Sequence, residues 1–381
     1  MVPFDFQHRT RFVFGPGKVR ELGAFAKELG CRRVLMVSDH GVVAAGHFQK
    51  GLQALQEAGL ETASFHEFRE NPNDEHVKFG VAVAQDFQPD LLVGLGGGSS
   101  MDCAKGINFV YSGGGRIQDY WGVGKATRPM LPMIAVPTTA GTGSEAQSFA
   151  LISDSQTHTK MACGDPKAAC RIAILDPELT LTQPARVTAL TGVDALTHAL
   201  ETFVTKKRNG LSLVYSREAW RLLSRGFPLV LEDGTNVEAR GWMQWGACLA
   251  GLAIETSMLG VAHATANPLT ARYGTTHGQA VGVMMPHVIR WNGEHYSDWY
   301  HELWRETNRD GNLSGDSVES LATWMESMVA RCGLETRLED CGVAREDLAA
   351  LPQEAVKQWT ASFNPRPVSL DDARALYEAA W

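Results

Sequence analysis

Short apolar runs alternate with helical patterns through the first half of the chain. The apolar runs predict strands at residues 33–38, 62–68, 90–96, 133–137, 149–153 and 172–175, with an edge strand at 11–14 before the turn Gly15-Pro16-Gly17. Helical periodicity predicts helices at 42–58 and 74–86. This alternation is typical of a parallel sheet with helices on its faces, so the first half is expected to form an α/β domain.

The pattern changes after Asp176-Pro177. Helical periodicity occupies residues 211–225, 239–259 and 317–332, and the last predicted helix, 370–381, has Ser369 as its N-cap. This half shows no strand-like alternation of apolar and polar residues. We therefore expect two domains, an α/β domain at residues 1–181 and an all-helical domain at 182–381, with the boundary near Gln183-Pro184.

Composition narrows the class of partner. The chain has 381 residues, of which 44% are hydrophobic and 20% charged, as in globular proteins. The net charge of −8, without a basic cluster, argues against nucleic acid and anionic membranes and favours a small molecule. The seven cysteines are scattered and never form a C-x-x-C pair, and the N-terminus lacks the apolar core of a signal peptide, so a reducing cytoplasmic location is expected.

A group of polar residues in the second half could hold a metal ion. Asp194 and His198 are four residues apart and would project from one helix face, and His263 and His277 follow in a stretch rich in Gly, Ala and Thr. Carboxylate and imidazole ligands suit Fe(II) or Zn(II). His287 is a rival for the fourth ligand, and the simpler interpretation is that these side chains are only hydrogen-bonded.

Two polar loops in the first half could bind a dinucleotide. The run Gly97-Gly98-Ser99 follows the strand at 90–96 and precedes a helix, where backbone N–H groups could hold a pyrophosphate, although a tight turn would need the same glycines. The run departs from the usual Rossmann fingerprint. Residues 137–145 form a second, threonine-rich loop. Asp39, at the end of the first central strand, could accept a ribose hydroxyl and would favour NAD over NADP, unless it is a solvated loop residue.

Taken together, these motifs are similar to those of the iron-containing (group III) alcohol dehydrogenase family. The resemblance rests on Gly15-Pro16-Gly17, Ser38-Asp39, Asn71-Pro72, Gly96-Gly97-Gly98-Ser99 with Asp102, residues 137–145, Lys160-Met161, Asp176-Pro177, Asp194 with His198, His263, His277-Gly278 and Asn364-Pro365-Arg366-Pro367. It implies a dehydroquinate synthase-like architecture, with an α/β dinucleotide-binding domain, an all-helical metal-binding domain and a cleft between them.

The resemblance also implies a role for each matching residue. The metal, usually Fe(II) with Zn(II) as the alternative, would be bound by Asp194, His198, His263 and His277. Asp39 would bind the adenosine ribose, and Gly97, Gly98 and Ser99 the pyrophosphate. The rest of the NAD site would be lined by Asn71, Thr138, Thr139, Thr142, Phe149, Lys160 and Leu179, with His277 close to the nicotinamide. Family members often form dimers or larger assemblies in which the N-terminal strand region contributes to the interface, so a homo-oligomer is expected.

One position departs from the family pattern. Many members have a histidine four residues after the counterpart of His263, whereas this chain has Asn267. That histidine is thought to contact substrate or relay a proton, and an asparagine amide does not titrate near neutral pH. The metal ligands are therefore retained, while the proton path is expected to differ.

The function implied is a metal-dependent oxidoreductase that transfers a hydride between NAD(H) and a small alcohol or its aldehyde or ketone. One alternative is an NAD-using lyase of the dehydroquinate synthase type, which net NADH production from a simple alcohol would exclude. Another is a nucleotide-binding module that has lost turnover, and a third is a metal-independent reductase of the maleylacetate type. The presence of all four metal ligands disfavours the last two.

Overall fold

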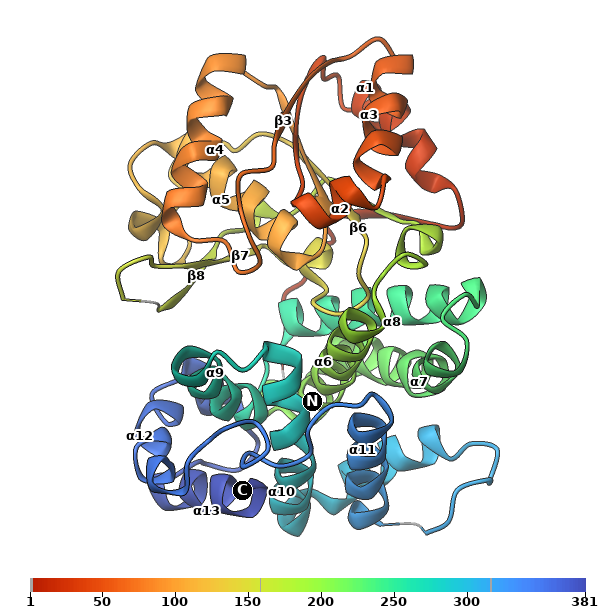
Figure 1. Cartoon of the computed structure of the whole chain (residues 1–381), viewed down its shortest axis with the longest axis vertical. Coiled ribbons are helices and arrows are strands. Elements are labelled where there is room, and N and C mark those ends of the chain that lie inside the picture. Colours follow the sequence, from red (N-terminus) through yellow and green to blue (C-terminus); the bar gives the residue numbers. More distant parts are fainter. Residues whose placement is uncertain (1–2, 158, 316) are drawn as a thin grey trace. The chain divides into compact units, whose positions relative to one another are not determined.

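The computed structural model describes residues 3–157, 159–315 and 317–381 (Figure 1). The chain forms two compact units. The α/β unit comprises Gln7–Gln183. The helical unit comprises Pro184–Trp381 together with the N-terminal residues as far as Phe6.

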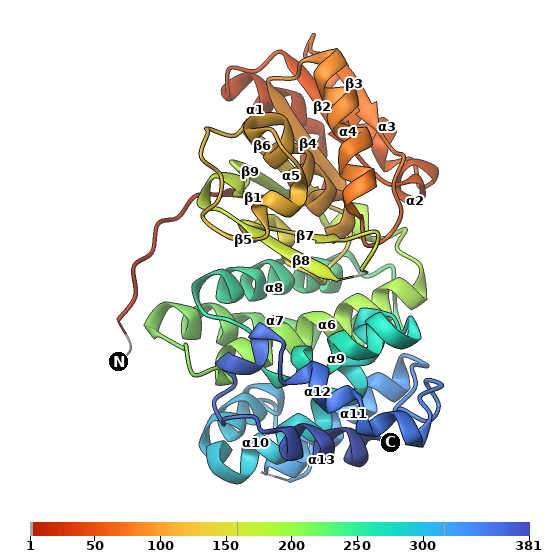
Figure 2. The ribbon, with the colours of Figure 1, turned by 90° about the vertical axis from the view of Figure 1, so that its left-hand side faces the viewer.

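A six-stranded parallel sheet forms the centre of the α/β unit (Figure 2). Its strands, in spatial order, are β1 (Arg11–Phe14), β9 (Ile172–Leu175), β6 (Met133–Pro137), β4 (Leu91–Gly96), β2 (Arg33–Val37) and β3 (Glu61–Phe65), and every neighbouring pair is parallel. The predicted strands of this sheet are confirmed, and β1 lies at its edge as expected. All six residues of β4 are buried, because a parallel sheet is covered on both faces.

The two faces of the sheet carry separate apolar cores, which alternate strand residues supply. Val34, Met36 and Leu91 pack with α1 (Leu22–Glu28) and α3 (His47–Glu57), whereas Leu35 and Leu92 pack with α4 (Asp74–Phe87) and α5 (Gly98–Gly113). Figure 1 shows these two sets of helices on opposite sides of the strands. The sheet therefore holds the loops at its strand ends between two packed layers.

Two details of the sequence prediction are wrong. The helix expected at 42–58 is two helices, α2 (His40–Ala44) and α3, because Gly46 between them has a φ of 78°. A second, three-stranded sheet was not foreseen as a sheet of its own. In it β7 (Phe149–Ser153) pairs antiparallel with β8 (Lys160–Gly164), which in turn pairs with the two-residue β5 (Gly122–Val123).

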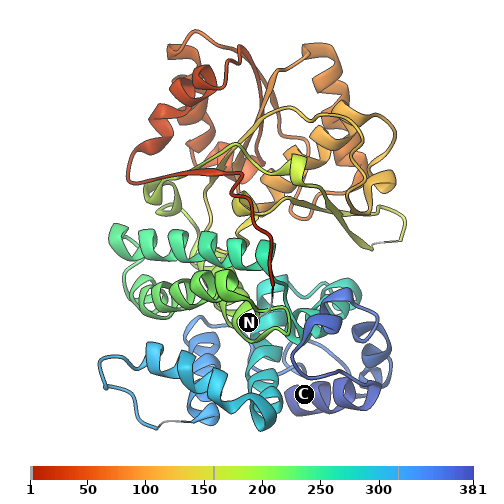
Figure 3. The same ribbon diagram turned by 180° about the vertical axis from the view of Figure 1, so that it is seen from behind.

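The helical unit has no strand among its described residues, as predicted. Its α-helices are α6 (Ala185–Val204), α7 (Gly210–Glu232), α8 (Val237–Thr256), α9 (Val261–Tyr273), α10 (His277–Thr307), α11 (Val318–Arg331), α12 (Leu351–Ala355) and α13 (Leu370–Ala380). Figure 3 shows α7 and α8, in neighbouring shades of green, running side by side. Helix α6 packs against α7, α8 and α10, and every residue from 192 to 204 is buried.

Short 3-10 helices complete the structure, and they are η1 (Lys18–Glu21), η2 (Ile117–Tyr120), η3 (Ser144–Ala146), η4 (Pro166–Ala168), η5 (Pro177–Thr180), η6 (Arg345–Ala349) and η7 (Trp359–Phe363). None of the described helices is by itself long and apolar enough to cross a bilayer. Helices α8 and α9 pass that test only as a pair, and the pair is bent by 103°.

Candidate metal centre and dinucleotide loops

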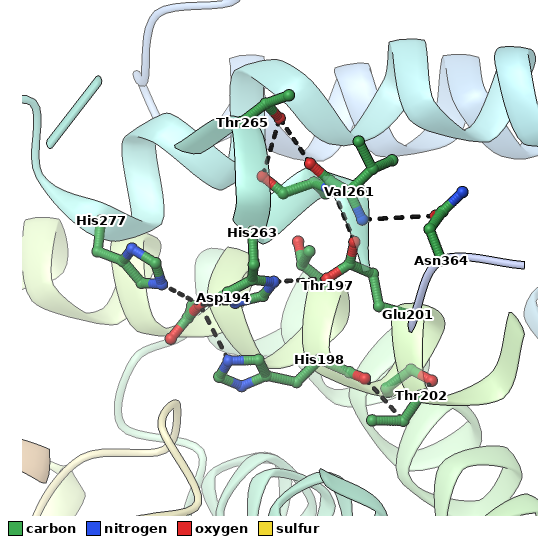
Figure 4. Close-up of polar contacts among 12 residues, drawn as sticks. Asp194, Thr197, His198, Glu201, Thr202, Val261, His263, Thr265, His277 and Asn364 are labelled. Carbon is green, nitrogen blue, oxygen red and sulfur yellow. Dashed lines mark hydrogen bonds and ion pairs between the residues drawn. The ribbon is translucent and has the colours of Figure 1, made fainter. Parts of the chain in front are cut away.

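The four predicted metal ligands meet at one carboxylate oxygen in the helical unit (Figure 4). Asp194 and His198 lie one turn apart on α6, His263 lies in the first turn of α9, and His277 is the first residue of α10. The Nε2 atoms of the three histidines lie 3.4, 3.6 and 3.7 Å from Asp194 Oδ1, in sequence order. Side chains that are up to 83 residues apart in sequence therefore face a common point.

The unpaired atoms at this point fit a divalent cation. Among the described residues, Asp194 Oδ1 and His263 Nε2 are buried atoms without a hydrogen-bond partner. Buried polar atoms normally find partners, so a carboxylate oxygen and an imidazole nitrogen that face each other unpaired are typical of a metal site. Ligand atoms of Asp194, His263 and His277 lie within 4.8 Å of one another. Only His277 is substantially exposed, at 28% of its side chain.

The electrostatics of the group also favour bound cations. Burial by itself would raise the pKa of Asp194, but His198, His263 and His277 outweigh it and hold that pKa well below its usual value. Burial would lower the pKa of His263, but Glu201 and Asp194 raise it to about 9. The centre thus combines the carboxylates of Asp194 and Glu201 with the three imidazoles. The rings of His198 and His263 are stacked, with centroids 4.9 Å apart and an angle of 16° between their planes.

Glu201 is a site residue that the sequence reasoning missed. It lies on α6 seven residues after Asp194, on the face that carries Asp194 and His198, and is 1% exposed. Its Oε2 lies 2.6 Å from Nδ1 of His263, and its Oε1 accepts a hydrogen bond of 2.7 Å from the N–H of Ala262. The signal was present in the sequence, because residues spaced i, i+4 and i+7 share a helix face.

A glycine brings the third histidine to the site. The first turn of α10 lies so close to α6 that a Cβ on Gly278 would come within 2.2 Å of the carbonyl oxygen of Leu190. Any larger residue at position 278 would push α10, and His277 with it, away from α6. The local sequence His277-Gly278 is therefore explained by helix packing as well as by the ligand.

The structure separates the rival residue from the centre. His287 lies further along α10, where burial and the charge of Arg290 lower its pKa, and it is not among the histidines whose Nε2 atoms lie near Asp194 Oδ1. Asn267 lies one turn after His263 on α9 and is half-buried. Its amide donates a hydrogen bond of 3.0 Å to Oε1 of Gln358, so its side chain is engaged with the chain just before η7.

In the α/β unit, Asp39 and the glycine loop lie at the point where the strand order reverses. After β2 the chain continues outward to β3, and β4 then lies on the other side of β2, so the loops after β2 and β4 are neighbours. Asp39 caps α2 through a hydrogen bond from the Val42 N–H (3.0 Å) and accepts one of 3.1 Å from the hydroxyl of Ser100. Open α/β sheets bind nucleotides at such a switch point.

The glycine loop is in close contact with the threonine-rich loop after β6. Gly97 is the N-cap of α5, and a Cβ on it would lie 3.4 Å from the Thr139 side chain. A Cβ on Gly98 would lie 2.8 Å from the side chain of Thr142. The N–H of Thr138 donates to the carbonyl of Gly96 (2.9 Å). The two loops thus form one surface around the N-terminus of α5, where backbone N–H groups favour an anion.

The remaining predicted cofactor residues are more widely placed. The N–H of Asn71, whose φ is 55°, donates to the hydroxyl of Ser99 (3.2 Å), and Lys160 lies 3.5 Å from the Asn71 side-chain oxygen. Phe149 lies on β7, with its carbonyl bound by Lys105. Leu179 is 1% exposed in the core on the α3 face, where it lines a cavity of about 290 Å³ with Gly17, Lys50, Asp176 and others. His277 belongs to the helical unit.

The chain thus combines two features. The α/β unit has a glycine loop at its switch point, and the helical unit that follows has one carboxylate and three imidazoles at a common point. Together these features define a class of nucleotide- and metal-binding enzymes. Comparison with protein-family models identifies the family. Residues 9–177 match the iron-containing alcohol dehydrogenase model, and residues 188–381 match the C-terminal model of the Fe-containing alcohol dehydrogenase family. The chain belongs to the iron-containing alcohol dehydrogenase family, as its sequence motifs indicated.

Individual relatives cover nearly the whole chain. The NAD-dependent methanol dehydrogenase of Bacillus methanolicus is 33% identical over 97% of both chains, and the 1,3-propanediol dehydrogenase of Klebsiella pneumoniae is 34% identical over 99% of both. The crystal structure of a 1,3-propanediol oxidoreductase superposes with a TM-score of 0.95, at 32% identity and with all of both chains covered. The expected fold class, an α/β domain with a parallel sheet followed by an all-helical domain, is confirmed.

Proposed function

We propose that this protein interconverts a small alcohol and its aldehyde or ketone, with NAD(H) as the hydride carrier and a divalent metal, Fe(II) in preference to Zn(II). One observation carries the proposal. In a chain of this family, three imidazole nitrogens converge within 3.4 to 3.7 Å of a single buried carboxylate oxygen. The named relatives that oxidise methanol and 1,3-propanediol support a short alcohol as substrate.

Asp194, His198, His263 and His277 would hold the metal. When bound, such an ion supplies Lewis acidity, which lowers the pKa of an alcohol and polarises a carbonyl group. The chain itself provides three things. Burial of Asp194, His198 and His263 excludes water, Glu201 orients the His263 ring, and His277 is the ligand with the most exposed side chain, at 28%. A low local dielectric strengthens every electrostatic contact made there.

The α/β unit would bind the dinucleotide. Gly97, Gly98 and Ser99 at the start of α5 would bind the pyrophosphate, and Asp39 the adenosine ribose. The carboxylate of Asp39 would repel a 2′-phosphate, which supports NAD over NADP, as does the name of the methanol dehydrogenase relative. Asn71, Thr138, Thr139, Thr142, Phe149, Lys160, Leu179 and His277 complete the proposed cofactor set.

Two further expectations are part of this proposal. The exposed edge strand β1, with Phe14 at 47% exposure, would take part in a homodimer or larger assembly. The seven cysteines are all free thiols, which supports a reducing cytoplasmic location. Light scattering of the purified protein would give the oligomeric state.

The decisive experiment removes single ligands. His198→Ala and His263→Ala should each abolish alcohol oxidation and reduce the bound metal, while NADH binding, measured by fluorescence, stays close to that of the parent protein. His295→Ala, an exposed histidine on α10, is the matched control and should retain activity and metal. The proteins would be loaded anaerobically with iron or with zinc and assayed on short aldehydes with NADH and NADPH. Turnover by metal-stripped His263→Ala protein would refute the proposed role of the metal.

A further inference from the structure

The helix that carries His263 begins without a cap of its own. Gly260 is the N-cap residue of α9 and has no side chain to accept the first N–H groups of the helix. Two residues distant in sequence replace it. The N–H of Ala262 donates to Oε1 of Glu201 at 2.7 Å, and the N–H of Val261 donates to Oδ1 of Asn364 at 3.4 Å. A carboxylate at this position is also favoured by the positive end of the helix dipole.

The same carboxylate fixes the imidazole ring of the next residue. Oε2 of Glu201 lies 2.6 Å from Nδ1 of His263, and both side chains are almost completely buried. A carboxylate can only accept a hydrogen bond, so Nδ1 carries the proton. In the neutral imidazole, which is the form that binds a metal, Nε2 is then the nitrogen with the lone pair. Nε2 is also the atom that lies 3.6 Å from Asp194 Oδ1.

We propose that Glu201 is a positioning residue of the metal centre, which selects the Nδ1-protonated form of His263 and holds the His263 ring and the N–H of the preceding Ala262 in place through two separate oxygens. This inference rests on the proposed function, since it assumes that a divalent metal binds at Asp194. Carboxylate partners of metal-bound histidines raise the affinity of the site because they fix the orientation and basicity of the ligand.

Two buried asparagines connect the start of α9 to the C-terminal segment through Asn364, which binds the N–H next to the one that Glu201 binds. Asn364 and Asn292 exchange two amide hydrogen bonds, of 3.1 and 2.9 Å, and both are buried. Gly260 lies between the two caps, where a Cβ would come within 3.0 Å of Glu201 Oε1 and 3.1 Å of Asn364 Oδ1. Gly260 cannot cap α9 itself, but because it has no side chain, Glu201 and Asn364 can both reach the first N–H groups of the helix.

Glu201→Gln tests the proposal with almost no change of shape. A glutamine that keeps its oxygen on the Ala262 N–H must turn its NH₂ group towards His263 Nδ1. The ring would then have to accept a hydrogen bond at Nδ1 and carry its proton on Nε2, which blocks metal binding. If the amide flips, two donors oppose each other at Ala262. Glu232→Gln, at an exposed carboxylate on α7 of the same unit, is the matched control.

The readout is the affinity of the metal-free full-length protein for Co(II), measured from the visible absorption of bound Co(II) and by competition with a chelator. Glu201→Gln should weaken Co(II) binding roughly 10- to 100-fold and alter the absorption spectrum, while Glu232→Gln leaves both unchanged. Glu201→Asp keeps the charge but is one methylene shorter, so its affinity should lie between those of Glu201→Gln and the parent protein. Thermal unfolding of the metal-free variants would show that they are folded.

The outcomes are distinguishable. If the parent protein binds Co(II) and Glu201→Gln binds it equally well with the same spectrum, the role of Glu201 is overturned and the proposed function stands. If the parent protein does not bind Co(II), the proposed function fails and this inference fails with it. If the variants do not fold, ¹H–¹⁵N spectra of the zinc-loaded parent protein decide. A proton on Nδ1 of His263 is expected, and a proton on Nε2 would overturn the proposal.

Discussion

Replacing Gly278 by alanine should damage the metal centre through packing alone. The new Cβ would lie 2.2 Å from the carbonyl oxygen of Leu190, well inside the 3.0 Å below which real Cβ atoms are essentially never found. The obstacle is helix backbone, so α10 has to move as a unit and take His277 with it. Alanine would gain up to about 1 kcal/mol of helix propensity, but overpacking of this kind costs about 1–3 kcal/mol, so the net effect should be destabilising.

The effect on activity should exceed the effect on stability. A shift of α10 on the order of 1 Å would misplace His277, and a misplacement of that size can reduce a catalytic rate about 100-fold. Thermal unfolding, metal content and kcat would be measured for Gly278→Ala beside Gly226→Ala. The control glycine lies inside α7, where a Cβ would meet its nearest neighbour at 3.2 Å, so the control should be much milder. Gly278→Ala protein with parental metal content and kcat would refute the close-packing argument.

Two other predictions follow from single contacts. Asp39→Ser retains a side-chain oxygen to cap α2 but removes the negative charge. NADH should therefore bind more weakly, and the loss of affinity should be smaller for NADPH, so that the ratio of the two dissociation constants shifts in favour of NADPH. An unchanged ratio would show that Asp39 does not discriminate between the two coenzymes. Asp194 Oδ1 and His263 Nε2 have no hydrogen-bond partner among the described residues, so a metal should bind to the folded protein and stabilise it. At a free metal concentration 100-fold above the dissociation constant, the gain in the free energy of unfolding should be about 2.7 kcal/mol. Identical unfolding curves with and without metal would contradict it.

The sequence predicts those elements that depend on residues close together in the chain. The continuous apolar strand at 91–96 and the capped final helix at 370–380 could be predicted because strand burial and helix capping act over a few residues. The pair Asp194 and His198 could be placed on one helix face for the same reason. Gly46 shows the limit, because only its φ of 78°, set by the local chain path, reveals that one apparent helix is two.

Tertiary contacts could not be predicted from spacing. Residue spacing did not distinguish His277 from His287, and the choice depends on the approach of α10 to α6 at Gly278. Glu201 was overlooked although its position on α6 was visible, because its partner His263 lies 62 residues later. Strand β8 was missed since its sequence Lys-Met-Ala-Cys-Gly has little β-branched character and it forms a strand only by pairing with β7.

The four side chains proposed as metal ligands all belong to one unit of the chain. All of them, and Glu201 behind them, come from α6, α9 and α10 inside the helical unit. No donor has to be supplied by the nucleotide or by the neighbouring half of the polypeptide. The proposed metal site is therefore built within one unit, so metal binding is expected not to require the dinucleotide, and Co(II) affinity measured with and without NADH would test this.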